Sequence, residues 1–413
     1  MSSTRRQFLK ASFGASTLLS LGRRVPGFLA RAAEAESVRP GGDKILVVVQ
    51  MAGGNDGLNT VVPYADDVYQ RSRPTLRLTA RQVHKIDSHL GFHPRMQGFL
   101  RLLDEGHLSV VQGVGYPHFD RNHEGSMHIW QTAVVDPAKA TTGWLGRAVD
   151  HIYRPETAQV PAVYTGEIAQ PFAVRAPRAI VPTIRALREA TLQPGPGGRG
   201  GQRAAAEPDA TNPLLDFVRR GAAAAEVRSR RIEAMAEARH SALAAGYPPF
   251  QFAEMLHTIA ELIRADVGVR IYYTELGGPS PGGFDNHAGQ LDNHAALLEQ
   301  LSESVAGFVH DLARDGLLDR VLLMTFSEFG RTLRENGRRG TDHGTAAPMF
   351  LAGGRLTGRL IGAHPSLTDL EGDEMKFHTD FRQVYATVLD QWLEIDSRAV
   401  LGARFEPVAM LRG

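Results

Sequence analysis

The chain has 413 residues, of which 43% are apolar and 22% are charged. These values exclude wholesale disorder, and the length suits one large α/β domain with an insertion. The net charge of +1 excludes an overall field that would gather nucleic acid, and the absence of cysteine excludes disulfides, thiolate nucleophiles and iron–sulfur centres.

The first 35 residues have the features of an export signal. Residues 3–10, Ser-Thr-Arg-Arg-Gln-Phe-Leu-Lys, form a twin-arginine motif, an apolar stretch follows at 11–21, and small-residue cleavage sites lie within 30–35. We therefore expect a signal peptide over 1–35, recognised by the twin-arginine export machinery, and a periplasmic or extracellular mature protein. Later apolar runs are too short to predict a transmembrane helix.

The first part of the mature chain predicts two buried strands and a helix. Residues 45–50 (ILVVVQ) are continuously apolar up to Gln50, as expected of a strand buried on both faces, and a glycine-rich turn follows. Apolar spacing predicts a helix over 94–103, with Pro94 in its first turn and Gly106 after its end. Residues 108–114 predict the second buried strand.

The middle of the chain differs in composition. Residues 193–213 are mostly Gly, Pro, Ala and Arg and predict a flexible loop, whereas the residues that follow it, up to 265, predict helix. We interpret 155–265 as a partly helical insertion or cap on the main domain.

The last third repeats the order of helix, glycine and strand. Strands are predicted over 269–275, 321–326 and 348–352, and helices over 297–312 and 381–393. Gly316 ends the first of these helices, and Thr379 or Asp380 caps the second. Buried strands alternating with amphipathic helices predict a doubly wound, mostly parallel sheet with helices on both faces.

Polar residues follow the buried strands, at the edge where doubly wound sheets bind ligands. The candidates after successive strands are Asn55 and Asp56, then His118 to Glu124, then Asp285 to His287, then Glu328 and Arg331, and finally Asp342 and His343. Carboxylates and imidazoles without thiolates suit Zn, Mn, Mg or Ca. The pattern therefore predicts a site for divalent metal at this edge.

Five motifs carry a resemblance to a known family. They are VVVQMAGGNDGLNTVVPY, NHEGSMHIWQTA, GGFDNHAGQ, SEFGRT and GTDHG, and they occur in this order between residues 44 and 395. The chain resembles an exported bacterial family catalogued as domain of unknown function 1501, which looks like a branch of the alkaline phosphatase and sulfatase superfamily. The resemblance implies an alkaline-phosphatase-like domain over 44–395.

The resemblance also implies a ligand set for one or two divalent ions. Its members are Asp56, Asp285, His287, Glu328, Asp342 and His343. Phe329 stands where the superfamily usually has a ligand histidine, so this chain departs from the superfamily pattern at one metal-ligand position. His123 and Arg331 would lie near the substrate, and Arg331 would meet its anionic group bidentately.

The nucleophile departs from the superfamily pattern. Relatives commonly have Ser-His at the start of the helix after the second strand, whereas this chain has Asn122-His123, and Asn cannot form the covalent intermediate of a hydroxyl. Ser126 is the nearest substitute, although a serine on the helix surface is the favoured interpretation.

Three functions follow as hypotheses. The first is an exported metal-dependent hydrolase of phosphate or sulfate esters, with a small anionic substrate. The second is a binding or structural protein that keeps the fold without its chemistry, which Asn122 and Phe329 suggest. The third is a metal-dependent enzyme of another reaction type on the same scaffold.

Overall fold

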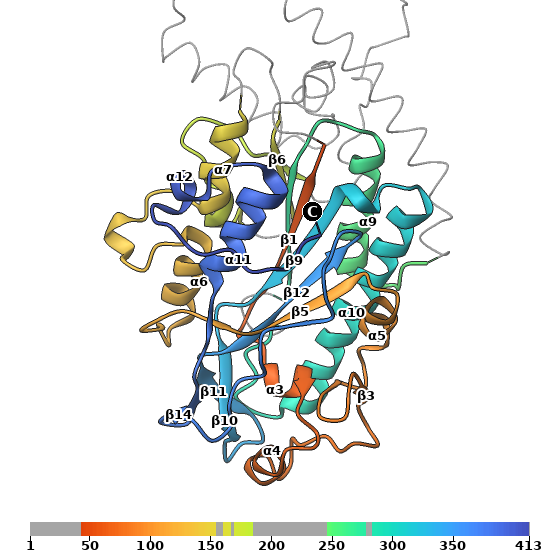
Figure 1. The fold of residues 1–413 in the computed structure, drawn as a ribbon, viewed down its shortest axis with the longest axis vertical. Coiled ribbons are helices and arrows are strands. Elements are labelled where there is room, and N and C mark those ends of the chain that lie inside the picture. Colours follow the sequence, from red (N-terminus) through yellow and green to blue (C-terminus); the bar gives the residue numbers. More distant parts are fainter. Residues whose placement is uncertain (1–42, 154–159, 167–168, 185–245, 278–282, 413) are drawn as a thin grey trace, which may run out of the picture.

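The computed structural model describes residues 43–153, 160–166, 169–184, 246–277 and 283–412. Within these ranges a central sheet is built from β1 (Ile45–Met51), β5 (Leu108–Gly115), β6 (Ala162–Thr165), β7 (Thr183–Ile184), β8 (Ile271–Leu276), β9 (Val321–Phe326), β12 (Ala347–Gly353), β13 (Leu360–Ile361) and β16 (Thr379–Asp380). Its main path runs β13–β5–β12–β9–β1–β8–β6–β7, with β16 beside β5 (Figure 1).

Strand direction confirms the prediction of a mostly parallel sheet. β1 lies at the centre and pairs in parallel with β8 and β9, with Val48 opposite both Tyr273 and Met324. β12 is antiparallel to its neighbours β9 and β5. Because β12 reverses direction between them, β5 and β9 run the same way. The carboxyl ends of β1, β5, β8 and β9 therefore meet at one edge.

Helices cover both faces of the sheet, as predicted (Figure 1). The first face carries α5 (Gln97–Asp104), α9 (Gln251–Arg264) and α10 (Gln290–Arg314), and the second carries α6 (His123–Thr132), α7 (Trp144–Ile152), α11 (Phe381–Thr387) and α12 (Ser397–Leu401). Side chains alternate along β1, so Val47 and Val49 enter the first core while Leu46 and Val48 enter the second.

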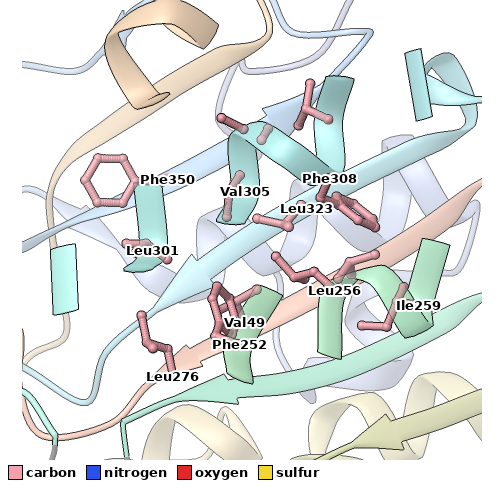
Figure 2. Close-up of a cluster of buried hydrophobic side chains, with 14 of the residues drawn as sticks. Val49, Phe252, Leu256, Ile259, Leu276, Leu301, Val305, Phe308, Leu323 and Phe350 are labelled. Atoms are coloured by element: carbon pink, nitrogen blue, oxygen red, sulfur yellow. The ribbon is translucent and has the colours of Figure 1, made fainter. Parts of the chain in front are cut away.

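The first core shows how the helices are held on the sheet. Val49 of β1 and Leu323 of β9 lie against Phe252 and Leu256 of α9 and Phe308 of α10 (Figure 2). Burying side chains of this size contributes about 1.5–3 kcal/mol each, which is enough to fix the helices on the face.

Two helices end at a glycine and a third begins at a capping residue, as the sequence predicts. Gly106 (φ 79°) follows α5, and Gly316 (φ 68°) follows α10. Asp380 caps α11 through a capping box with Gln383. The helix predicted from Pro94 begins later, at Gln97, because residues 94 and 95 form a turn.

Part of the predicted insertion over 155–265 lies among the described residues. There β6 pairs in parallel with β8, β7 pairs with β6, and α9 covers the sheet, so these segments are joined to the central sheet. The predicted loop 193–213 and the predicted signal peptide 1–35 lie outside the described residues. In the described part of the chain, no helix is both long and apolar enough to span a bilayer.

Candidate metal centre

Four segments meet at the carboxyl edge of the sheet. The turn after β1 carries Asp56, and the loop after β5 leads into α6, which begins with His123. The segment between β8 and α10 carries Asp285 and His287. After β9 the chain forms an antiparallel pair of β10 (Gly330–Glu335) and β11 (Thr341–Gly344), and His343 lies in β11.

A cluster of three histidines and one aspartate lies where these segments converge. His123, Asp285, His287 and His343 each offer a ligand atom within 4.8 Å of the others. The Asp285 carboxylate lies 3.4 Å from His123 Nε2, 3.1 Å from His287 Nε2 and 3.4 Å from His343 Nε2. We call these four residues the metal centre because they form a candidate site for a metal ion. Asp285, His287 and His343 belong to the predicted ligand set, whereas the sequence placed His123 beside the substrate.

Hydrogen bonds on the far side of two rings fix how those rings point. His343 Nδ1 lies 2.7 Å from the Arg121 carbonyl oxygen, which only accepts, so this nitrogen carries the proton. His287 Nδ1 donates to Asp342 Oδ1 at 3.0 Å. Each ring therefore turns its Nε2 atom inward, and the two Nε2 atoms lie 2.8 Å apart.

The third ring is held by Glu328. His123 Nδ1 lies 2.9 Å from Glu328 Oε1, which also accepts from the Gly53 amide at 2.8 Å. Ser327 Oγ donates to the other oxygen at 3.1 Å. Glu328 is buried and engaged on both oxygens, so the structure joins it to the predicted ligands through His123 rather than directly. His123 Nε2 is buried and has no hydrogen-bond partner among the described residues.

The charges of the cluster are tuned by these contacts. The hydrogen bond from His123 to Glu328 raises the pKa of His123 against the effect of burial. Burial lowers the pKa of His343 and favours its neutral, ligating form. Burial alone would raise the pKa of Asp285, but Arg331, His287 and His123 hold it below its ordinary value.

Arg331 differs from its predicted role as an anion-binding residue. Its side chain is 1% exposed, and its guanidinium donates to the carbonyl oxygens of Gly53, Gly54, Thr341 and Phe284. It also donates to Asp285 Oδ1 at 2.8 Å. These contacts use the guanidinium to tie the turns after β1 and β8 to β11, and to position Asp285.

Phe329 forms an aromatic wall of the metal centre. Its ring centroid lies 4.4 Å from that of His343 and 4.9 Å from that of His123. Gly54 makes this possible because a Cβ there would lie 2.3 Å from the Phe329 ring. The residue that departs from the superfamily pattern thus packs on two of the imidazoles.

Asp56 is buried away from the four-residue cluster, in an ion pair. Arg73, at the end of α4 (Asp67–Ser72), is fully buried and places Nη1 2.5 Å from Asp56 Oδ2, where Gln290 Nε2 also donates at 2.5 Å. Arg73 lowers the pKa of Asp56 although burial works in the opposite direction. No motif or spacing in the sequence indicates this pair.

The two residues considered for the nucleophile position have other partners. Asn122 is the N-cap of α6, and its side chain accepts from the Glu124 amide at 2.9 Å. Ser126 is fully buried, donates to the Glu328 carbonyl oxygen at 2.5 Å and bonds the Tyr116 hydroxyl at 2.7 Å. Ser126 is therefore inside the protein, whereas the sequence offered a surface position as its simpler explanation.

Comparisons with known proteins give remote structural similarities. No curated protein matches the chain. The zinc complex of the C-terminal periplasmic domain of EcEptC from Escherichia coli matches at 10% identity and a TM-score of 0.36, covering 76% of this chain and 75% of that one. The lipoteichoic acid synthase LtaP from Listeria monocytogenes matches at 10% identity and a TM-score of 0.38, covering 78% and 68%. The PsFucS1 sulfatase from Pseudoalteromonas sp. matches at 11% identity and a TM-score of 0.37, covering 93% and 76%.

Because these TM-scores are below 0.5, the description of the metal centre rests on its own residues. The sequence itself gives a firmer match, over residues 43–403, to the family described as "Protein of unknown function (DUF1501)". The match spans every strand of the central sheet and all four residues of the metal centre. The chain belongs to this family.

Proposed function

We propose that this protein is a hydrolase of phosphate or sulfate esters that depends on one divalent metal ion. The observation that carries the proposal is the inward orientation of three imidazoles around Asp285. His287 and His343 direct their Nε2 atoms at each other across 2.8 Å, and Asp285 Oδ1 lies within 3.4 Å of both. A divalent cation bound by these inner atoms would displace the proton that otherwise links them.

The donor set fits a transition metal better than calcium or magnesium. His123, His287 and His343 supply nitrogen, and Asp285 supplies oxygen. Three imidazoles and one carboxylate are typical of zinc and manganese sites, whereas calcium and magnesium prefer oxygen alone. When bound, such an ion would polarise a phosphoryl or sulfuryl oxygen and stabilise charge on the leaving oxygen.

The surroundings of the metal centre support its rigidity. Glu328, Asp342 and the Arg121 carbonyl oxygen each accept a hydrogen bond from the outer nitrogen of one histidine. Such partners fix ring orientation and raise the basicity of the inner nitrogen. Arg331 holds Asp285, and the Phe329 ring keeps water from one side of the rings.

The proposal is for one ion rather than two because of Asp56. The buried Arg73 guanidinium already neutralises this carboxylate. Asp56 Oδ1 has no hydrogen-bond partner among the described residues, but the positive charge of the buried Arg73 guanidinium beside it would repel a second cation.

A binding or structural role is the second candidate. It is favoured by the engagement of Asn122 as a helix cap and of Ser126 in the interior, which leaves the usual nucleophile position without a free hydroxyl. On this alternative the metal centre holds an ion that serves structure or ligand binding, and no ester is hydrolysed.

Turnover separates the two candidates. We would assay the zinc-loaded and manganese-loaded protein on p-nitrophenyl phosphate and p-nitrophenyl sulfate, with Asp285→Asn and His287→Ala beside His310→Ala. His310 is a matched control because it pairs with Glu105 on the outer side of α10. Hydrolysis that is lost in the first two variants and kept in the control supports the hydrolase. Bound metal without turnover of either ester supports the alternative.

The proposed setting is the periplasm or the cell exterior. Arg5 and Arg6 form the twin arginines of the signal. Replacing both by Lys should leave the full-length precursor inside the cell, as detected by immunoblotting of cell fractions. Unchanged export of the double variant would exclude the twin-arginine route.

A further inference from the structure

A cavity of about 600 Å³ is lined in part by Arg121 and Thr345, which lie two residues from His123 and His343 in the chain. One wall is the loop after β5, with Tyr116, Phe119 and Arg121. The other is the hairpin of β14 (Leu370–Glu371) and β15 (Glu374–Met375) with the residues that follow it, up to Phe377. The volume falls within the range of about 300–1,000 Å³ that is typical of sites for organic ligands.

Arg121 connects the cavity to the metal centre. Its carbonyl oxygen accepts a hydrogen bond from His343 Nδ1, while its side chain lines the cavity and pairs with Glu374. Thr345, two residues after His343, also lines the cavity and donates to the Met375 carbonyl oxygen. An ester whose anionic group reached the metal centre would therefore have this cavity next to it for its organic part.

The hairpin wall is anchored rather than loose. The Leu333 amide of β10 donates to the Asp373 carbonyl oxygen at 3.1 Å, and β16 pairs with the end of β5 just after the hairpin. Phe377 packs over Gly115, where a Cβ would lie only 2.7 Å from the Phe377 Cβ. The cavity is thus preformed, which lowers the entropic cost of binding.

The lining combines aromatic rings with balanced charge. Phe119 and Phe377 are half-buried, and the Arg121 guanidinium lies 5.7 Å from the Phe119 ring centroid. Of the two cationic side chains of the lining, Arg121 pairs with Glu374, whereas Lys376 pairs with Asp369 outside the lining. Glu374 is buried and its charge is met by Arg121, whereas Glu371 is exposed at the rim.

This lining favours one class of organic group. A purely apolar group would cover the charged side chains without giving them partners, at a cost. An anionic group would meet the carboxylate of Glu371, because both cations of the lining are already paired. Hydroxyl groups both donate and accept, so a neutral group with several hydroxyls satisfies the carboxylates and the cations together, while its C–H face lies on the aromatic rings.

We propose that this cavity binds a sugar ring and that the ester split at the metal centre is carried by a carbohydrate. The inference rests on the proposed hydrolase function for the reaction, but the binding of the sugar does not require turnover. Glu371 is the residue we expect to recognise hydroxyls, and Phe377 the residue that supports the ring.

The kinetic test uses substrates matched in leaving group and ring size. We would compare the zinc-loaded enzyme on the 6-phosphates and 6-sulfates of glucose, galactose and mannose with cyclohexylmethyl phosphate and sulfate, which lack the hydroxyls. At least one hexose ester should exceed its cyclohexylmethyl analogue about 10-fold in kcat/KM, and Glu371→Ala should bring that ratio towards one. Glu406→Ala is the control, because Glu406 is exposed and pairs with Arg404 away from the cavity. A ratio near one for all three sugars, or a preference for cyclohexylmethyl, would overturn the proposal.

A binding test keeps this inference separate from the proposed hydrolysis. Saturation-transfer difference NMR with the methyl pyranosides of the same three sugars should give signals with the wild-type protein that are lost in Phe377→Ala. Binding without turnover would support the sugar site and sink only the hydrolase proposal. Turnover of small aryl esters without any saturation transfer would sink the sugar site and leave the hydrolase standing.

Discussion

At the scale of single residues, the hydrogen bonds of three histidine Nδ1 atoms explain how the rings of the metal centre are oriented. A neutral imidazole carries one proton. When Nδ1 donates that proton in a hydrogen bond to an acceptor, the Nε2 lone pair is available to bind a metal ion. Glu328, Asp342 and the Arg121 carbonyl oxygen serve as these acceptors. The direction of each ring is therefore set by a group that does not itself reach the metal position.

The first prediction concerns Glu328, which we expect to act through His123. Glu328→Gln keeps the shape of the side chain but weakens the charge-assisted bond to His123 Nδ1. Loss of such a partner lowers metal affinity about 10–100-fold, and we expect the low end of this range because an acceptor remains. Zinc titration by calorimetry measures the change. Glu124→Gln is the control, because Glu124 lies on α6 next to His123. Equal zinc affinities in the two variants would contradict the role of Glu328.

The second prediction concerns Glu275 at the end of β8. Tyr164 donates to Glu275 Oε1 at 2.6 Å, Oε2 has no partner among the described residues, and burial raises the pKa of Glu275 from 4.5 to about 7. The folded state therefore holds its proton more tightly than the unfolded state, so its stabilising effect is present below pH 4.5 and is lost as the pH rises to about 7.

Glu275→Gln should remove this loss. At pH 8 the variant should gain up to about 3 kcal/mol in the free energy of unfolding relative to wild type, since one pKa unit corresponds to about 1.4 kcal/mol. At pH 4.5 the difference should be small. Urea denaturation at both pH values measures it, and a gain independent of pH would contradict the burial of a protonated carboxyl.

At the scale of elements, α6 shows how a residue at the expected position of a nucleophile, Asn122, can instead cap the helix. The side chain of Asn122 accepts from the Glu124 amide, which satisfies a helix-terminal donor and fixes the start of the helix at His123. The cap thus sets the position of one residue of the metal centre.

The third prediction follows from that cap. Asn122→Ala should lower the free energy of unfolding by about 1 kcal/mol, whereas Asn122→Asp, which also caps, should change it little. Thermal denaturation followed by circular dichroism measures both. If the alanine variant were as stable as wild type, the cap would contribute nothing and the residue would need another explanation.

The fourth prediction concerns Arg73, whose side chain links the end of α4 to β10. Arg73 binds Asp56 and also donates to the carbonyl oxygens of Leu333 and Thr332. Arg73→Met leaves a buried charge unpaired and should cost about 3–5 kcal/mol, whereas the double variant with Asp56→Asn should recover part of that loss. A double variant no more stable than Arg73→Met would show that the ion pair is not the source of the stability.

Part of this arrangement could be predicted from sequence and part could not. Asp285, His287 and His343 follow strands whose carboxyl ends share an edge, and the apolar runs predict those strands, so their proximity follows from local patterns. The pair of His123 and Glu328 spans 205 positions, and Asp56 meets Arg73 through the packing of α4 on β10. The spacing of apolar residues does not predict such long-range pairs, because they depend on how whole helices and strands pack.

At the scale of the whole molecule, the sheet brings distant segments to one point. β12 runs against its neighbours, so β5 and β9 keep the same direction on either side of it, and the loops after both strands reach the metal centre. The same edge carries the cavity that we assign to a sugar. A single sheet edge therefore supplies both the proposed reaction site and the proposed binding site.

The most direct test of the central claim is the position of a bound metal. Anomalous X-ray diffraction at the zinc edge, from crystals of the zinc-loaded protein, should show one strong peak per chain about 2.0–2.2 Å from His123, His287, His343 and Asp285. A strong peak beside Asp56 instead, or none among the three imidazoles at full zinc loading, would contradict the account.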